Sequence, residues 1–371
     1  MNRTAVILLL LCATHSPSAA QQYTRENLRI PFAAAGPRGL EALLVRPADG
    51  RRYPLALISH GSPRRVEERP QMTPGRYYMQ ALEFARRGFA VLIVTRRAYG
   101  TSGGDYAERA PVCGQNEYVN ASNEAARDLR AAVEFMQTRT DISSQGMIAI
   151  GRSAGGVASI ALAADPPSGL AAVISFAGGR GSRGDRDVCG ADAQVESFGV
   201  FGRTARVPML WVYSENDQYF WPELAQRFHA AFQASGGRAK FVAAPPLGRD
   251  GHSLFSEVGA SLWIPIVDGF LREQDLGLRT LLPPLAGEAL PAPAHLIQGG
   301  AGRASFRQYP RANDNKAFAV SQTGGYAWRS GAGTEREAEV AAREACERSG
   351  AVCTIYAVND KLESERAAPA R

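Results

Sequence analysis

The stretch that decides the fold is GRSAG at residues 151–155, between an apolar run at 147–150 and a helix-forming run at 157–164. Because glycine has no Cβ, the two glycines allow a sharp strand-to-helix turn that exposes the Ser153 hydroxyl. The predicted helix begins directly after the serine, so its first N–H groups face any oxyanion that forms there. The same letters fit a helix-capping turn without chemistry, but the strand–turn–helix context favours a nucleophile.

Apolar runs alternate with helical patterns from about residue 39 to 274, which predicts an α/β fold with a doubly wound, mostly parallel sheet. Several runs are continuously apolar, as expected of strands covered on both faces. Such sheets carry their sites at the carboxyl ends of the strands. The predicted strands cover residues 40–45, 55–59, 89–95, 147–150, 171–176, 209–213 and 239–244. The predicted helices cover residues 75–87, 122–139, 155–164, 222–235 and 254–273.

The base for this serine is sought among only five histidines. His252 lies in GRDGHS at 248–253, a loop between the last predicted strand and the last predicted helix of this region. A base there reaches across the carboxyl edge of the sheet to Ser153, so His252 is the predicted general base. The other histidines fall in the N-terminal segment, at a strand end, inside a helix and in a proline-rich stretch: His15, His60, His229 and His295.

The acid that orients the base is expected after the predicted strand at 209–213. The sequence SENDQ at 214–218 offers two carboxylates there, Glu215 and Asp217. With either one, the order along the chain is serine, acid, histidine. That order is the α/β-hydrolase order and differs from those of the other serine hydrolase folds.

The oxyanion needs two preorganised donors. One predicted donor is the backbone N–H of Ala154, directly after the nucleophile. The second is expected from HGS at 60–62, where Gly61 lets the backbone approach closely, so the N–H of Ser62 is the predicted donor. His60 itself is interpreted as structural.

Aromatic residues directly follow the candidate acid: Tyr219, Phe220 and Trp221. They form either a substrate-binding wall or the core packing of the next helix. Residues 178–206 carry Cys189 and are expected to cover the pocket as a lid. Arg64 and Arg65 follow the oxyanion loop and are interpreted as a solvated loop rather than as groups that attract an anionic substrate.

Residues 39–274 resemble an exported α/β-hydrolase of the dienelactone hydrolase-like group. The resemblance rests on SHG at 59–61, RAYGTSG at 97–103, GRSAGG at 151–156, END at 215–217 and DGH at 250–252. It implies hydrolysis of carboxylic esters or related acyl bonds through an acyl-serine, and it favours Asp217 over Glu215 as the acid. Dienelactone hydrolases proper have cysteine at the position of Ser153, so their substrate is not implied.

The N-terminus has the pattern of a signal peptide over residues 1–20. Arg3 gives the positive start, residues 5–13 the apolar stretch and SAA at 18–20 the cleavage site. The apolar stretch is too short to span a bilayer. We therefore expect an exported protein, periplasmic or secreted, without stable membrane insertion after cleavage.

Four cysteines follow the predicted signal peptide: Cys113, Cys189, Cys346 and Cys353. An even number in an exported protein favours two disulfides. Three pairings exist and the sequence does not decide among them, but Cys113–Cys189 with Cys346–Cys353 keeps each bridge within one domain. No spacing of cysteines or histidines indicates a metal site.

The domain organisation changes after the predicted hydrolase domain at 21–275. Residues 276–312 are rich in proline and glycine, as in a linker. Residues 313–362 predict a small α+β domain of ββαβ order, with Thr334 and Glu337 as a capping box, and 363–371 a flexible tail. This region is similar to a small cysteine-paired module of bacterial exported proteins. Its strands are expected at 317–321, 326–330 and 352–358.

The formal net charge of +6 comes from scattered arginines without a basic stripe interleaved with aromatics, so nucleic acid is not an expected partner. The glycine-rich pieces at 178–184 and 299–302 read as loops, and no cofactor is predicted. The expected function is hydrolysis of a small-molecule ester or acyl substrate by Ser153, His252 and Asp217. The alternatives are a serine peptidase or amidase with the same triad, and a non-catalytic envelope binding protein. The oligomeric state is not indicated.

Overall fold

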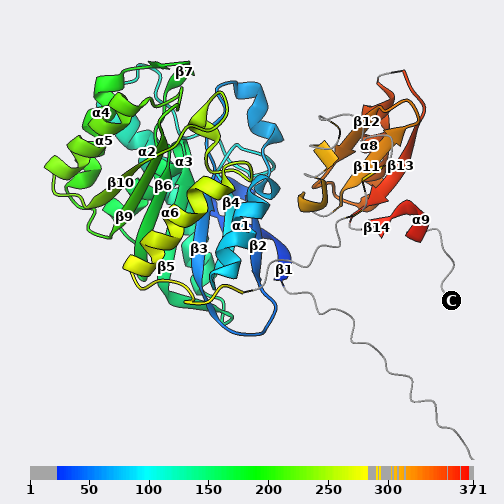
Figure 1. Ribbon diagram of the computed structural model, residues 1–371, viewed down its shortest axis with the longest axis horizontal. Helices are drawn as coiled ribbons and strands as arrows, with labels where there is room; N and C mark the ends of the chain where they lie inside the picture. Colours follow the sequence, from blue (N-terminus) through cyan, green and yellow to red (C-terminus); the bar gives the residue numbers. More distant parts are fainter. Residues whose placement is uncertain are drawn as a thin grey trace, which may run out of the picture.

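The computed structural model contains two main sheets in the part of the chain that it describes (Figure 1). That part comprises residues 23–282, 290, 292–293, 302, 305–306, 309–312, 315–348, 350–359 and 361–366. The predicted signal peptide and much of the predicted linker lie outside the described residues, as does the end of the predicted tail.

The larger sheet has eight strands in the order β1-β2-β4-β3-β5-β6-β9-β10. Strand β2 pairs antiparallel with both β1 and β4, and all other neighbours pair in parallel. This confirms the predicted α/β fold with a doubly wound, mostly parallel sheet. The strands are β1 (Tyr23–Phe32), β2 (Gly36–Pro47), β3 (Tyr53–Ser59), β4 (Ala90–Thr95), β5 (Ile142–Arg152), β6 (Leu170–Phe176), β9 (Met209–Ser214) and β10 (Ala239–Ala244).

Helices cover both faces of this sheet, because successive side chains of each strand point to opposite sides. Leu57 of β3 points into the core on one face of the sheet, and its neighbour Ile58 points into the core on the other face. The first face carries α2 (Gln115–Gln137), α3 (Ala154–Ala164), α4 (Ala191–Gly202) and α5 (Pro222–Ala234). The second carries α1 (Tyr78–Arg86) and α6 (Ala260–Glu273) (Figure 1).

The elements that the sequence pattern does not predict are short or half-polar. Edge strand β1 buries few of its residues, so it lacks the continuous apolar run of the central strands. Helix α6 begins at Ala260 rather than near residue 254, and the short 3₁₀ helix η4 (Gly251–Ser253) precedes it. Leu254 and Phe255 are buried in the core between these two helices, so their apolar character does not mark a helix start.

The smaller sheet is antiparallel, in the order β12-β11-β13-β14. Its elements are β11 (Ala317–Ser321), β12 (Tyr326–Arg329), α8 (Glu335–Glu347), β13 (Cys353–Val358), β14 (Lys361–Leu362) and α9 (Glu363–Arg366). The Thr334 side chain accepts the N–H of Glu337 at 3.2 Å, which caps α8 as the sequence indicates. The sulfurs of Cys346 and Cys353 lie 2.05 Å apart and join the end of α8 to β13. Strand β14 and helix α9 extend the expected ββαβ order, and α9 lies within the expected tail.

Candidate active site

Ser153 stands between β5 and α3 in a conformation that few non-glycine residues adopt, with φ 55° and ψ −123°. Such a backbone costs about 1–3 kcal/mol and persists only where neighbours hold it. Here the Ser153 N–H donates to the carbonyl of Phe176 at 2.9 Å, and the Ser153 carbonyl accepts the N–H of Gly156 at 2.9 Å. The turn therefore fixes the serine at the carboxyl edge of the sheet.

The glycines of the turn are required by close contacts. A Cβ on Gly151 would lie 2.0 Å from the Gly155 carbonyl oxygen, and one on Gly155 would lie 2.2 Å from the Ser59 carbonyl oxygen. Both distances are far below any real Cβ contact, so only glycine fits at either position. The two glycines of the GxSxG pattern are thus also required for α3 to pack against β3 and β5.

His252 is oriented by Asp217. Its Nδ1 lies 3.1 and 3.2 Å from the two carboxylate oxygens, and both side chains are buried. Asp217 also accepts the N–H groups of Tyr219 and Phe220, at 2.8 and 3.0 Å. With Nδ1–H donating to the carboxylate, Nε2 carries the lone pair of a neutral imidazole. Glu215, the other candidate acid, is exposed, whereas the His252 side chain is bound to Asp217.

Burial lowers the pKa of His252 below its ordinary value of 6.5, although the Asp217 charge and hydrogen bond act in the opposite direction. The neutral imidazole is therefore the stable form near neutral pH, as a general base requires.

The loop that carries His252 is held at three points. Asp250 accepts the N–H groups of His252 and Gln218, at 2.9 and 3.0 Å, which joins the base loop to the acid loop. The Nε of Arg152 donates to the His252 carbonyl at 3.0 Å. This contact connects the residue before the candidate nucleophile to the loop of the candidate base. The sequence does not predict it, because the GxSxG pattern does not specify the residue at that position.

The predicted oxyanion donors lie on either side of the serine. Ala154 is the first residue of α3, and Ser62 follows β3. Neither backbone N–H meets an acceptor within the described ranges of the chain. A Cβ on Gly61 would lie 3.1 Å from the Cβ of Ser153, so the 60–62 loop passes directly against the nucleophile. The Ser62 hydroxyl is itself engaged with the Tyr99 hydroxyl at 2.5 Å.

His60 has two backbone partners. Its Nδ1 donates to the Gly61 carbonyl at 2.7 Å, and its Nε2 accepts the N–H of Arg96 at 3.0 Å. Burial, with a contribution from the Arg96 charge, lowers its pKa to about 3. The arrangement supports the structural role expected for this histidine.

A buried ion network lies behind the 60–62 loop. Glu108 pairs with Arg96 at 2.5 Å and with Arg180 at 2.7 Å. Burial alone would raise the pKa of Glu108, but the two guanidinium groups outweigh it and hold the pKa at about 2. Glu108 is thus a carboxylate whose charge is fully matched by its neighbours. None of these three residues stood out in the sequence, because the pairs are far apart along the chain.

A cavity of about 680 Å³ opens at Ser153. Ala154, Ser62, Tyr219 and Phe220 contribute to its wall, as expected. Trp221 does not line the cavity: it is the N-cap of α5 and its ring contacts the Arg186 guanidinium at 5.4 Å. The charged residues of the wall are Arg64, Arg69, Glu108, Arg109 and Arg180.

Two features of the wall add to the sequence interpretation or differ from it. Arg64 is exposed, as interpreted, but its guanidinium also lies 3.6 Å from the ring centroid of Tyr219. The expected lid at 178–206 is divided: residues 179–182 line the cavity, whereas Phe198 and Phe201 of α4 are buried in the main core. Only the first part of this segment covers the pocket, with the hairpin β7 (Ser182–Gly184) and β8 (Asp187–Val188).

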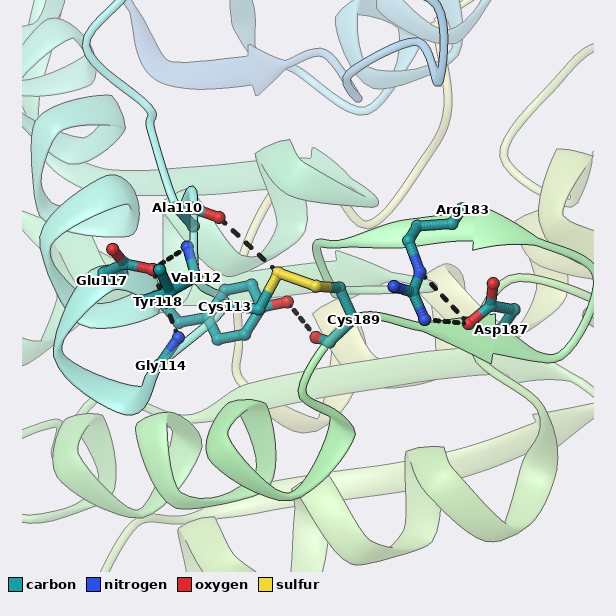
Figure 2. Close-up of a disulfide and its surroundings, with 9 residues drawn as sticks. All are labelled: Ala110, Val112, Cys113, Gly114, Glu117, Tyr118, Arg183, Asp187 and Cys189. Atoms are coloured by element: carbon teal, nitrogen blue, oxygen red, sulfur yellow. Dashed lines mark hydrogen bonds and ion pairs between the residues drawn. A yellow bond between two sulfur atoms is a disulfide. The ribbon is translucent and has the colours of Figure 1, made fainter.

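The hairpin is attached to the segment before α2 by a disulfide (Figure 2). The sulfurs of Cys113 and Cys189 lie 1.97 Å apart, in agreement with the favoured pairing. Cys113 precedes α2 and Cys189 follows β8. Tyr118 of α2 also donates its hydroxyl to the Cys189 carbonyl. The cavity edge is therefore closed by one covalent bond and one hydrogen bond.

Among the described residues, no group of three or more histidine, cysteine, aspartate and glutamate side chains is arranged to hold a metal ion. Within the same residues, no helix is both long and apolar enough to cross a membrane.

The X-Pro dipeptidyl-peptidase (S15) family model matches residues 37–202, which is less than half of the chain. The match includes Ser153 and ends before Asp217 and His252. Together with the order of the main sheet, it supports a protein of the α/β-hydrolase superfamily. The closer likeness to dienelactone hydrolases remains a prediction. No curated protein sequence matches the chain.

Several solved structures resemble this chain at low sequence identity. Pyrococcus horikoshii acylaminoacyl peptidase is 15% identical with a TM-score of 0.49, over 70% of this chain and 42% of that one. A thermophilic esterase from Thermogutta terrifontis is 16% identical with a TM-score of 0.49, over 68% and 94%. A CIB-like hydrolase from Thermoplasma acidophilum is 15% identical with a TM-score of 0.45, over 68% and 99%. The chain spans less than half of the peptidase.

Proposed function

We propose that this protein is an exported serine hydrolase that cleaves carboxylic esters through an acyl-serine, with Ser153, His252 and Asp217 as its triad. The observation that carries the proposal is the Asp217-bound, neutral imidazole of His252, on a sheet whose strand-to-helix turn holds Ser153 in a strained conformation. Tyr219 and Phe220 connect the two, because both line the cavity at Ser153 and both contact the His252 ring, at 3.8 and 5.6 Å between centroids.

In the proposed reaction, His252 Nε2 takes the Ser153 hydroxyl proton as Oγ attacks the ester carbonyl. Asp217 holds the Nδ1–H tautomer and stabilises the imidazolium. The N–H groups of Ala154 and Ser62 donate to the oxyanion of the tetrahedral intermediate. The imidazolium then protonates the leaving alcohol, and water, deprotonated by His252, releases the acid from Ser153.

A peptidase with the same triad is the second candidate, because the matching family model is that of a dipeptidyl peptidase. An enzyme that removes dipeptides must hold a free α-ammonium group, which calls for an unpaired carboxylate in the pocket. Glu108 is the sole carboxylate among the described residues that line the cavity, and Arg96 and Arg180 already neutralise it. The charge of the wall therefore favours esters over substrates with a cationic terminus.

The test is hydrolysis of p-nitrophenyl esters of increasing acyl length by the purified protein and by Ser153→Ala. We expect serine-dependent turnover and a fall of several orders of magnitude in the variant. A fluorophosphonate probe should label the wild type and not Ser153→Ala. Retention of most activity by folded Ser153→Ala would overturn the assignment of the nucleophile. Hydrolysis of Xaa-Pro anilides in preference to esters would favour the peptidase.

The two disulfides support export to an oxidising compartment. We propose a periplasmic or secreted location, reached through cleavage of the signal peptide after residue 20. N-terminal sequencing of the protein recovered from outside the cytoplasm tests this directly, since the cleaved form begins at Gln21. An intact N-terminus on protein confined to the cytoplasm would contradict it.

A further inference from the structure

The cavity wall at Ser153 is unusually cationic. Four arginines and one glutamate are its charged residues, and the glutamate is already shared between Arg180 and the buried Arg96. A concave site with an excess of guanidinium groups repels cations and stabilises an anionic group.

Arg180 is the central residue of this wall. Its side chain is 7% exposed, and its Nη1 donates to Glu108 at 2.7 Å. Its Nε and Nη2 are buried and meet no acceptor in the part of the chain that the structure describes. Buried donors without a partner are rare in folded proteins because each one costs its lost hydration. A planar guanidinium with two free donors fits the two oxygens of a carboxylate.

Arg180 and Ser153 line the same cavity, and the backbone next to Arg180 contacts Ser153. The N–H of Gly179, the neighbour of Arg180, donates to the Ser153 carbonyl at 3.2 Å. A Cβ on Gly179 would lie 2.5 Å from the ring of Phe220, so the backbone at this point is pressed against the cavity wall. Arg180 is therefore fixed on the same short segment that contacts Ser153.

Arg69 adds a further guanidinium with an unused donor to the same wall. Its guanidinium lies 3.5 Å from the ring centroid of Tyr106 and 5.8 Å from that of Tyr99. No carboxylate within the described residues pairs with it, and its Nε is buried without an acceptor. Because the Tyr99 hydroxyl also lies 3.5 Å from Glu108, Arg69 and Arg180 converge on one cluster of the wall.

We propose that the substrate is an ester that carries a free carboxylate, and that Arg180, with Arg69, binds this carboxylate while Ser153 attacks the ester carbonyl. This inference rests on the proposed serine hydrolase function and adds the chemical class of the substrate. It also gives a role to donors that the catalytic steps leave unused.

The test compares esters that differ only in charge. Monomethyl succinate, glutarate and adipate are each set against the methyl ester of the corresponding monoamide, which has the same shape without the charge. 4-Acetoxybutanoate and its amide place the carboxylate on the alcohol side. A charge-assisted pair of hydrogen bonds predicts a kcat/KM at least about tenfold higher for the best acid than for its amide.

The variant Arg180→Gln should bring this ratio close to one, because it lowers kcat/KM for the acids much more than for the neutral amide esters. Arg69→Gln should lower the ratio in part. Arg183→Gln is the matched control, because it removes the same charge three residues further along the chain, at a residue that does not line the cavity. If Arg180→Gln does not fold, Arg180→Lys keeps a charge beside Glu108 but loses the planar fork, and it should also lower the ratio.

A binding measurement distinguishes a failure of this inference from a failure of the proposed function. Glutarate should bind to Ser153→Ala, measured by calorimetry, and the affinity should fall at least about tenfold when Arg180→Gln is added. Serine-dependent turnover of neutral esters without any preference for the acids, together with no glutarate binding, would overturn the carboxylate site and leave the hydrolase intact. Glutarate binding through Arg180 without turnover of any ester would uphold the site and overturn the hydrolase.

Discussion

The Tyr219 ring lies parallel to the His252 imidazole, with 3.8 Å between their centroids and 5° between their planes. The Arg64 guanidinium lies 3.6 Å from the same tyrosine ring, so the two groups must occupy its opposite faces. Arg64 also donates to Ser182 and Gly184 of the hairpin, at 2.9 and 2.8 Å. The base is thus connected to the hairpin that borders the cavity through a stack of three side chains.

The stack predicts that Tyr219 positions His252. Tyr219→Leu removes the ring, and we expect a fall in kcat of about two- to tenfold, since aromatic pairs contribute about 0.5–1.5 kcal/mol beyond burial. Because the imidazole then becomes better hydrated, the acid limb of kcat/KM should move up towards pH 6.5. Tyr219→Phe keeps the ring and serves as the control. A change in KM alone, with the acid limb in place, would assign Tyr219 to substrate packing instead.

The acid position is tested by a pair of amide substitutions. Asp217→Asn removes the charge that orients His252, and kcat should fall on the order of 10³- to 10⁴-fold. Glu215→Gln is the matched control two residues away: the side chain is exposed, and activity should stay within about twofold of the wild type. Both are measured on the same ester at saturating concentration. Equal losses in the two variants would contradict the assignment of Asp217.

The pH profile is set by the buried base. Because the pKa of His252 lies below 6.5, the neutral and active form persists to lower pH than for an exposed histidine. As the pH falls through this pKa, His252 becomes protonated and kcat/KM should decline with a slope of one. We expect the midpoint of that acid limb below pH 6.5, measured in constant-ionic-strength buffers. A midpoint clearly above 6.5 would show that Asp217 outweighs burial.

The sequence predicts the strand-to-helix turn at Ser153 well, because the requirements of this turn are local. Gly151 and Gly155 must lack a Cβ whatever the rest of the protein does, so the pattern around Ser153 is visible in five letters. The candidate base and acid could be proposed because parallel strands end at one edge of the sheet, where loops from distant parts of the chain meet. Their pairing in the structure agrees with the predicted Asp217 and His252.

The charged wall of the cavity was not predictable in the same way. Arg180 and Glu108 are 72 residues apart, and no periodicity or motif connects them. Arg64 is exposed, as the sequence indicates, but its contact with the Tyr219 ring is not visible in the sequence. The sequence also does not show that only the first part of the 178–206 segment lines the cavity. Phe198 and Phe201, in its second part, become core residues only through packing against other helices. These properties depend on tertiary contacts rather than on local pattern.

The Cys113–Cys189 disulfide should control access to the cavity. The double variant Cys113→Ser, Cys189→Ser removes a bond between residues 76 apart in sequence, and the hairpin with Arg180 becomes less ordered. We expect KM to rise several-fold with a smaller change in kcat. The double variant Cys346→Ser, Cys353→Ser is the control, because its bond lies in the smaller sheet region. Unchanged ester kinetics in the first variant would show that the hairpin keeps its position without the bond.

His60 predicts a specific loss of stability in acid. Its pKa is about 3 in the folded protein and near 6.5 in the unfolded chain, so between these values only the unfolded state binds the proton. The free energy of unfolding should therefore decrease by about 1.4 kcal/mol for each pH unit below 6.5 from this group alone.

His60→Gln isolates that contribution, because glutamine can still accept the Arg96 N–H but does not titrate. Asp128, whose burial raises its pKa to about 6, acts in the opposite direction between 6 and 3.8 and is present in both proteins. The difference between the urea unfolding free energies of wild type and variant, followed from neutral pH down to about pH 4, should thus shrink steadily with acidity. A difference independent of pH would mean that His60 is already charged in the folded state and that the Arg96 contact is not the one that holds it.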